Sequence, residues 1–260
     1  MTTAPEMARA MGAVLPEWAR AGWLAAGYRG SHAHGTTIPA EDEHGTDDTD
    51  VFLVTLQPRD FYASLRPTGR DCFETAGADL DILVYDARKF FGLLIAQNPN
   101  SHAWLWTSAF YSTPKWASIV EQREALLSRS MFKHLVGYAE GQRAMMRRLG
   151  TKGRYAGAKR AALMERYGYD IKNAAHCLRL IFLGQRLALT GQLEVQLPAD
   201  MLQTLVSVKR GEQTFQWVER TFENEIGRFR ELEPTSMLPQ AVPLAAFDNL
   251  WTSLFAEPRP

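Results

Sequence analysis

The sequence is poor in cysteine, has no long hydrophobic run and carries no excess of one charge. Only two cysteines occur in 260 residues, Cys72 and Cys177, and they form no CxxC pair. A disulfide framework and a cysteine-based zinc site are therefore not expected, and a reducing cytoplasm is the expected location. No run of about 18 apolar residues occurs, so no membrane span is expected. Glu6 and Arg9 interrupt the N-terminal run, so no signal peptide is expected either.

The charge is balanced overall but separates along the chain. Lys+Arg and Asp+Glu both number 29. Residues 1–120 carry 9 basic and 14 acidic side chains, residues 121–186 carry 14 and 5, and residues 187–260 carry 6 and 10. A basic segment after an acidic one fits a polyanionic substrate that one part of the protein grips and another processes. A solvated helix surface is the alternative interpretation.

The apolar pattern predicts an α+β fold. With 46% hydrophobic and 22% charged residues, the chain can form one large domain or two small ones. Short apolar runs at 51–54 and 80–85 predict buried strands. A helix is expected at 87–96, and the Asn98-Pro99-Asn100 turn that follows is expected to end it.

The rest of the chain is predicted to be mostly helical. Residues 5–26 have helical spacing with a break or kink at Pro16, and residues 58–78 look irregular. Beyond residue 116 the only competing strand pattern is near 193–197, and the tail from 233 is expected to cover the surface. Helices are predicted at 116–128, 130–149, 155–167, 170–190, 198–209 and 211–232. The predicted organisation is a catalytic domain of residues 1–115 and a helical domain of residues 116–260 with a basic face.

The most informative feature is a glycine turn followed by closely spaced aspartates. Gly30-Ser31 precedes Asp48-Thr49-Asp50 at the first strand, and Asp79 and Asp81 lie at the second. Residues two apart on a strand share a face, so neighbouring strands could bring three carboxylates to one point. Carboxylates that close repel, and bound Mg²⁺ relieves the repulsion. The pattern favours two-metal chemistry on a nucleoside triphosphate; ordinary acidic residues at strand ends are the alternative.

These motifs resemble the GS…DxD…D pattern of the DNA polymerase β-like nucleotidyltransferase superfamily. Gly30-Ser31-His32-Ala33-His34-Gly35-Thr36 is similar to the GSxAxG-type turn of one branch, the predicted nucleotidyltransferases associated with RNA repair. Two features depart from that branch: the loop between Ser31 and Asp48, and the threonine at position 49. Neither removes a ligand. The likeness covers residues 28–191, and further matching motifs lie at 81–85, 87–90, 98–100, 138–142 and 172–180.

The resemblance implies a small nucleotidyltransferase palm, made of a mixed β-sheet with flanking helices, followed by a helical domain. It also implies use of an NTP with Mg²⁺, or Mn²⁺ in its place. Asp48, Asp50 and Asp81 are then the expected catalytic and metal-binding residues. Asp81 is preferred to Asp79 because it starts the apolar run. Gly30 and Ser31 are expected to hold the phosphates, since glycine lets the backbone approach closely and serine adds a hydroxyl.

A basic helix face supplies further candidates for nucleotide binding. Lys172, His176 and Arg179 lie at i, i+4 and i+7, so they share one face of a helix. Periodicity alone favours a solvated face, whereas the resemblance favours contacts with phosphate. Lys89, which with Arg88 opens a helix after the second strand, is a further candidate for a phosphate contact, and surface placement is its alternative.

Several other side chains have two interpretations. His32, His34 and His44 invite a zinc hypothesis, but their spacing fits no structural zinc pattern and mobile loop histidines are favoured. Trp104 and Trp106 could stack a base, but core packing is favoured. Four basic residues of the middle segment are expected to form a diffuse surface facing RNA. They are Lys133, Arg143, Arg147 and Arg148.

The expected reaction is transfer of an NMP from an NTP to a hydroxyl, with release of pyrophosphate. An RNA 3′ end, such as that of a tRNA, is the favoured acceptor because of the basic segment and the family association. Two alternatives remain open. One is NMP transfer to a protein hydroxyl, as in toxin or antitoxin relatives, and the other is a non-catalytic nucleotide or RNA sensor with the same fold.

Overall fold

A computed structural model describes residues 4–39, 41–45, 49–63, 71–76, 80–147 and 158–256. The chain forms two compact units. Unit 1 comprises Met1–Ala33, Asp48–Ser128 and Ala241–Pro260, and unit 2 comprises His34–Asp47 and Arg129–Gln240. These bounds differ from a division at residue 115, because residues 116–128 and the C-terminal segment belong to the first unit and residues 34–47 to the second.

Unit 1 is built on a five-stranded mixed sheet in the order β3-β4-β2-β1-β5. β2 and β4 are parallel, and the other neighbouring pairs are antiparallel. Its strands are β1 (Trp23–Tyr28), β2 (Thr49–Thr55), β3 (Cys72–Ala76), β4 (Leu80–Asp86) and β5 (Ala109–Ser112). Its helices are α1 (Ala4–Val14), η1 (Glu17–Ala19), α3 (Arg59–Ala63), α4 (Ala87–Ile95), α5 (Pro99–Ala103), η2 (Trp104–Trp106), α6 (Pro114–Glu121), η3 (Arg123–Leu126) and α12 (Leu244–Ser253). α2 (Gly30–His34) joins the two units.

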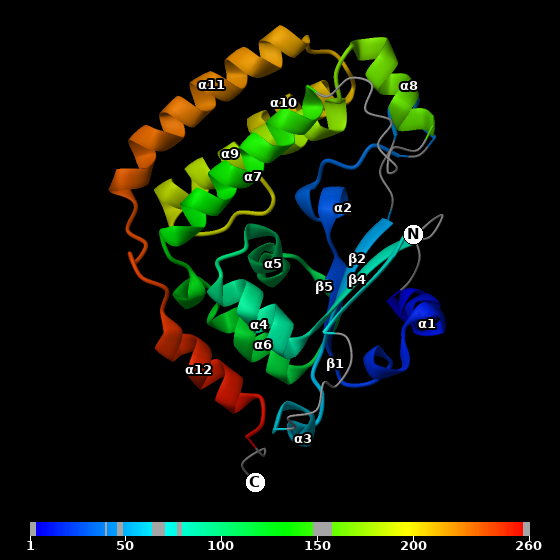
Figure 1. Ribbon diagram of the computed structural model, residues 1–260, viewed down its shortest axis with the longest axis vertical. Helices are drawn as coiled ribbons and strands as arrows, with labels where there is room; N and C mark the ends of the chain where they lie inside the picture. Colours follow the sequence, from blue (N-terminus) through cyan, green and yellow to red (C-terminus); the bar gives the residue numbers. More distant parts are fainter. Residues whose placement is uncertain are drawn as a thin grey trace. The chain divides into compact units, whose positions relative to one another are not determined.

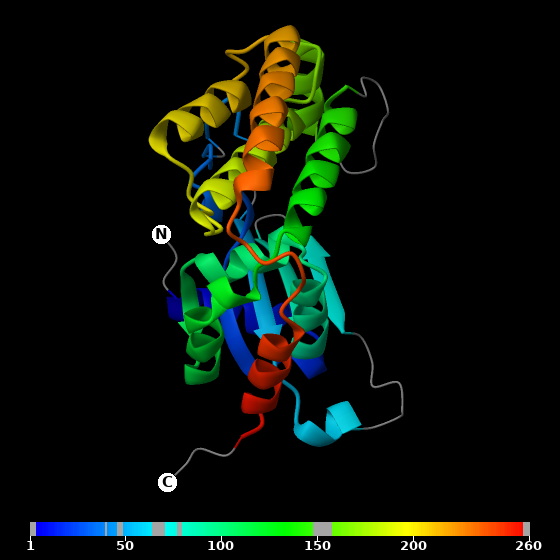
Figure 2. The same cartoon turned by 90° about the vertical axis from the view of Figure 1, so that its left-hand side faces the viewer.

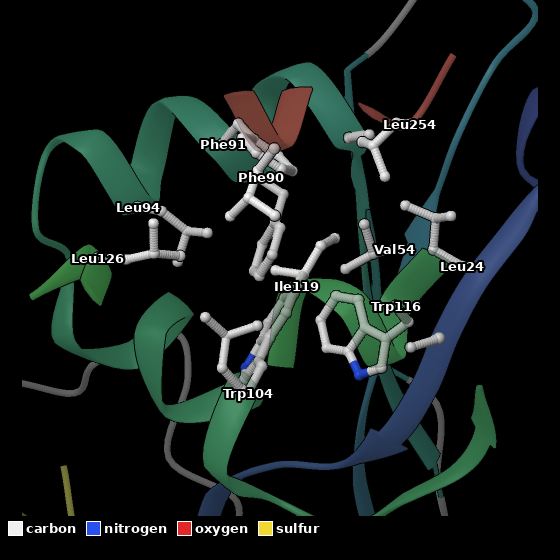
Figure 3. Close-up of a cluster of buried hydrophobic side chains, with 14 of the residues drawn as sticks. Leu24, Val54, Phe90, Phe91, Leu94, Trp104, Trp116, Ile119, Leu126 and Leu254 are labelled. Atoms are coloured by element: carbon white, nitrogen blue, oxygen red, sulfur yellow. The ribbon is translucent and has the colours of Figure 1, made fainter. Parts of the chain in front are cut away.

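Hydrophobic side chains cover both faces of this sheet. On one face α4, α6 and α12 bury an aromatic cluster, while α1 packs its methionines on the other face (Figure 1). Trp104 lies at the centre of the first cluster, stacked on Phe52 at 4.6 Å and on Phe90 at 5.6 Å between ring centroids (Figure 3). Trp104 therefore packs in the core of unit 1, and the base-stacking interpretation is wrong for it.

Unit 2 is helical in the residues that the structure describes. Its elements are α7 (Ser130–Met146), α8 (Ala158–Tyr167), α9 (Ile171–Thr190), α10 (Ala199–Lys209), α11 (Phe215–Leu232) and η4 (Glu233–Thr235). α9 is the buried centre, with α7, α10 and α11 packed around it (Figures 1 and 2). Asp170 caps its first turn by accepting hydrogen bonds from two backbone amides, and Gly191 ends it in the left-handed conformation at φ 70°.

The predicted α+β class is confirmed, but the structure differs from the local predictions at four places. The predicted helix 5–26 ends at Val14, and Trp23–Tyr28 is a strand paired with β2 and β5 on either side. The irregular segment contains β3, and the tail contains α12, whose Phe247 and Leu250 are buried in unit 1. No strand forms at 193–197. Within the described residues, no helix is long and apolar enough to cross a membrane.

Candidate active site

Two of the predicted aspartates face each other across neighbouring strands. Asp50 on β2 and Asp81 on β4 are register partners in the parallel pair. Each is the second residue of its strand, so both carboxylates lie at the same edge of the sheet and on the same face. Asp48 and Asp79 lie outside the described residues. The pairing joins the two halves of the predicted carboxylate cluster.

The glycine turn lies directly against this pair. Gly30 has φ 61°, a left-handed conformation that glycine adopts without strain. A methyl group on its Cα would overlap the Oδ2 atom of Asp50, so this carboxylate oxygen points at the glycine. The Ser31 hydroxyl that follows is buried and has no hydrogen-bond partner. The turn thus brings a bare backbone and an unsatisfied hydroxyl to the carboxylates.

Gly30→Ala is expected to damage both stability and activity. The substitution forces a left-handed alanine, which costs about 1–2 kcal/mol, and displaces Asp50 as well. Chemical denaturation should show a lower free energy of unfolding, and any transferase activity should fall with it. The matched control is Gly12→Ala in α1, where no atom lies within 4 Å of the added methyl group. That control should raise the free energy of unfolding by about 0.5–1 kcal/mol. Equal behaviour of the two variants would contradict the described turn.

Arg29 is the residue of this site that the sequence analysis missed. Its terminal nitrogen Nη2 lies 3.0 Å from Asp81 Oδ1, 3.3 Å from Asp50 Oδ1 and 3.9 Å from Glu74 Oε1. Its backbone N–H donates to the Asp50 carbonyl at 3.0 Å, and its Nε donates to the Val51 carbonyl at 3.2 Å. The side chain is anchored at its base while its tip lies among three carboxylates. No motif marked it, because its role follows from the strand pairing.

Three buried polar atoms at this edge of the sheet lack hydrogen-bond partners. In the described part of the chain four buried side-chain atoms have no hydrogen-bond partner, and three of them belong to Arg29, Ser31 and Asp81. The Arg29–Asp81 contact is close enough for an ion pair but is not aligned as a hydrogen bond. Buried polar atoms normally have partners, so their concentration here marks a place built for a polar ligand. Among the described side chains, no group of three His, Cys, Asp or Glu residues could hold a metal.

The predicted basic helix face lies on α9 in unit 2. Arg179 is 7% exposed, and its Nη2 lies 2.8 Å from His176 Nε2, which accepts the hydrogen bond. Within the described residues no carboxylate lies within ion-pair distance of this guanidinium. Burial alone lowers the pKa of Arg179 to about 10. A buried cation whose partner is a neutral ring is costly, and a bound anion would offset that cost.

Two buried histidines accompany this arginine. Burial, followed by the charges of Arg179 and Lys172, holds the pKa of His176 well below its usual range. His34 donates from Nδ1 to the Val195 carbonyl at 3.3 Å, and burial and the charge of Arg179 likewise lower its pKa. Both rings are therefore neutral at pH 7. His34 belongs to the same buried cationic cluster, although its sequence position suggested a loop.

The prediction of mobile loop histidines is wrong for two of the three. His34 and His44 are both 9% exposed. His44 lies between Asp42 Oδ1 at 3.2 Å and the Tyr167 hydroxyl at 2.6 Å, which attaches this segment to α8. Only His32 is exposed; its ring stacks on Tyr28 with centroids 5.6 Å apart.

Lys89 is not brought to the carboxylate pair. It lies on α4, which follows the far end of β4, and five residues separate Asp81 from that end. At the rise of a strand this is about 16 Å. Its side chain is 41% exposed and lies 3.8 Å from Asp71. The surface interpretation fits this placement.

Two of the four basic residues predicted to face RNA form ion pairs inside unit 2. Arg143 pairs with Glu219 at 2.7 Å and Glu223 at 2.5 Å, and Arg147 also pairs with Glu219. Burial of Arg143, 13% exposed, between α7 and α11 is inconsistent with a surface facing RNA. Lys133 is exposed, and Arg148 lies outside the described residues. The pairs of Arg143 and Arg147 with carboxylates reduce the positive charge that these two residues can present.

A mixed sheet with facing aspartates beside a glycine–serine turn defines the nucleotidyltransferase-like class of fold. The model of the RNA repair pathway DNA polymerase beta family matches residues 19–251, and the chain belongs to this family. Among solved structures the chain is similar to a nucleotidyltransferase-like protein from Exiguobacterium sibiricum. The identity is 11% and the TM-score 0.30, over 98% of this chain and 81% of that one. Because this TM-score is low, the family assignment rests on the family match alone. No curated protein matches it.

Proposed function

We propose that this protein is a Mg²⁺-dependent nucleotidyltransferase that transfers an NMP from an NTP to a hydroxyl, with an RNA 3′ end as the favoured acceptor. The observation that carries the proposal is the Asp50–Asp81 pair beside an unsatisfied Ser31 hydroxyl. In the reaction the acceptor oxygen bonds to the α-phosphorus, the bond from that phosphorus to the β-phosphate oxygen breaks, and pyrophosphate leaves.

The residues of unit 1 are assigned distinct tasks. Asp81 takes the proton of the acceptor hydroxyl, as a carboxylate at the same edge of the sheet as Asp50. Gly30 and Ser31 bind the terminal phosphates through the exposed backbone and the hydroxyl. Asp48, Asp50 and Asp81 would hold Mg²⁺, or Mn²⁺, which when bound supplies charge neutralisation of the triphosphate and activation of the attacking oxygen.

A phosphate contact is assigned to one face of α9 in unit 2. Lys172, His176 and Arg179 share one face of α9, and Arg179 is a buried cation with no carboxylate near it in the described residues. Charge-assisted hydrogen bonds from a guanidinium to phosphate are strong and can be bidentate. His34, buried with them, is added to this set.

The preference for RNA rests on the family, whose description names an RNA repair pathway. The charge of residues 121–186 is weaker support than its sum suggests, because Arg143, Arg147 and Arg166 form ion pairs with carboxylates of α11 and the 41–45 segment. A protein hydroxyl as acceptor shares the chemistry and differs only in the partner. The acceptor is therefore the first question for experiment.

Incubation of the protein with each labelled NTP, Mg²⁺ and a tRNA pool tests the proposal. We expect label on the RNA and an equal amount of pyrophosphate, both abolished by EDTA. Mass spectrometry of added proteins after incubation with ATP tests the other acceptor. Label on protein alone would overturn the RNA assignment. Nucleotide binding in a thermal-shift assay, without pyrophosphate release under any condition, would overturn the enzymatic proposal in favour of a sensor.

A further inference from the structure

Arg29 holds a position that a divalent cation would also require. Its Nη2 approaches the Oδ1 atoms of both Asp50 and Asp81, at 3.3 and 3.0 Å. Magnesium binds carboxylate oxygens at about 2.0–2.1 Å. A cation that bridged these two Oδ1 atoms would meet the guanidinium nitrogen at close range, and two positive charges that close repel. The two cannot bind the same pair of oxygens together.

Hydrogen bonds hold the backbone N–H and the Nε atom of Arg29, so only the end of its guanidinium can change position. The backbone N–H continues the β1–β2 ladder to Asp50, and Nε is held by the Val51 carbonyl. Nη2, by contrast, is buried and has no aligned hydrogen bond. The tip is thus held by charge rather than by hydrogen-bond geometry. Glu74 on β3 lies 3.9 Å from it, is 61% exposed and offers another carboxylate.

We propose that Arg29 is a positioning residue that serves as the counter-cation of the metal-free site. Its guanidinium holds Asp50 and Asp81 together until a divalent cation takes their Oδ1 atoms, and the competition sets the affinity for that cation. This inference rests on the proposed function, because it concerns the same carboxylates. Two consequences go beyond that function. The carboxylate pair is stable without metal, and its affinity for a divalent cation is lower than it would be without Arg29.

The test compares Arg29→Met and Arg29→Lys with the wild type. Each protein is freed of metal and titrated with Mn²⁺, with and without a non-hydrolysable ATP analogue, by calorimetry and by thermal unfolding. The matched control is Arg9→Met, which removes an exposed arginine of α1 in the same unit. For Arg29→Met we expect a lower metal-free Tm, a Kd for Mn²⁺ lower by about tenfold and a Tm restored by the metal. Arg29→Lys should fall between.

Other results separate the possible failures. Tighter Mn²⁺ binding by Arg29→Met, with Arg9→Met unchanged, supports the proposal. If the wild type binds Mn²⁺ and Arg29→Met binds it no more tightly, the proposal fails and the proposed function stands. If Arg29→Met has a lower Tm that Mn²⁺ does not restore, Arg29 only stabilises the pairing of the strand ends, and the proposal is overturned. If no protein binds Mn²⁺ in either titration, both the metal site of the proposed function and this inference fail.

Discussion

Asp50→Asn is expected to reduce NMP transfer by about 10³-fold or more while the protein stays folded. The amide keeps the shape of the side chain but removes the charge that binds a cation. The fold should persist because Arg29 retains Asp81 as a partner at 3.0 Å and its backbone bond to residue 50 is unaffected. Single-turnover release of labelled pyrophosphate measures the loss, and thermal unfolding checks the fold.

Asp60→Asn is the control for this experiment. Asp60 is an exposed aspartate in the first turn of α3 in the same unit, so its loss should change neither rate nor stability appreciably. Activity of Asp50→Asn close to that of the wild type would show that the facing aspartates are not the reaction centre.

Arg179→Met is expected to change stability and binding in opposite directions. The lowering of the Arg179 pKa to about 10 corresponds to a burial cost of about 3 kcal/mol for the charged side chain. Methionine of similar volume removes this cost, so the free energy of unfolding should rise by about 1–3 kcal/mol. The KM for NTP should rise by about 30- to 100-fold, because the substitution removes the proposed phosphate contact. Denaturant titration and steady-state kinetics measure the two effects.

Arg186→Met on the same helix is the matched control. Arg186 lies seven residues further along α9 and pairs with Glu194 at 2.8 Å. Because its charge is satisfied within unit 2, its loss should lower stability slightly and leave the KM for NTP unchanged. A fall in stability for Arg179→Met, with no change in KM, would mean that the arginine is a structural residue and binds no nucleotide.

The carboxylate pair could be predicted because it depends on local rules alone. Aspartate at the second position of two short apolar strands shares a face with its counterpart once the strands are parallel neighbours, and β2 and β4 are. Helix α9 was equally clear, with an aspartate cap at its start and a glycine at its end. In both cases the residues that allow the prediction lie in, or next to, the strand or helix that they predict.

The features that were missed depend on contacts distant in sequence. Trp23–Tyr28 contains alanines that favour a helix, but pairing on both sides makes it a strand. Arg29 follows β1 and meets Asp50, Asp81 and Glu74 only when β2, β4 and β3 pair in the order of the sheet. The charge of residues 121–186 suggested an exposed basic face, whereas Glu219 and Glu223, some 75 residues further on, pair with it. A sum of charges along the chain does not reveal which of them meet.

The membership of α12 in unit 1 has a consequence for the order in which the protein can fold during synthesis. Phe247, Leu250 and Leu254 complete the cluster that contains Phe90 and Trp104, yet they follow unit 2 in the chain. Unit 2 lies between Ser128 and Ala241 in the chain, apart from residues 34–47. Nascent domains commonly fold in order from the N-terminus. Here the segments of unit 2 are all made before the core of unit 1 can close, so the five-stranded sheet of unit 1 is completed after them.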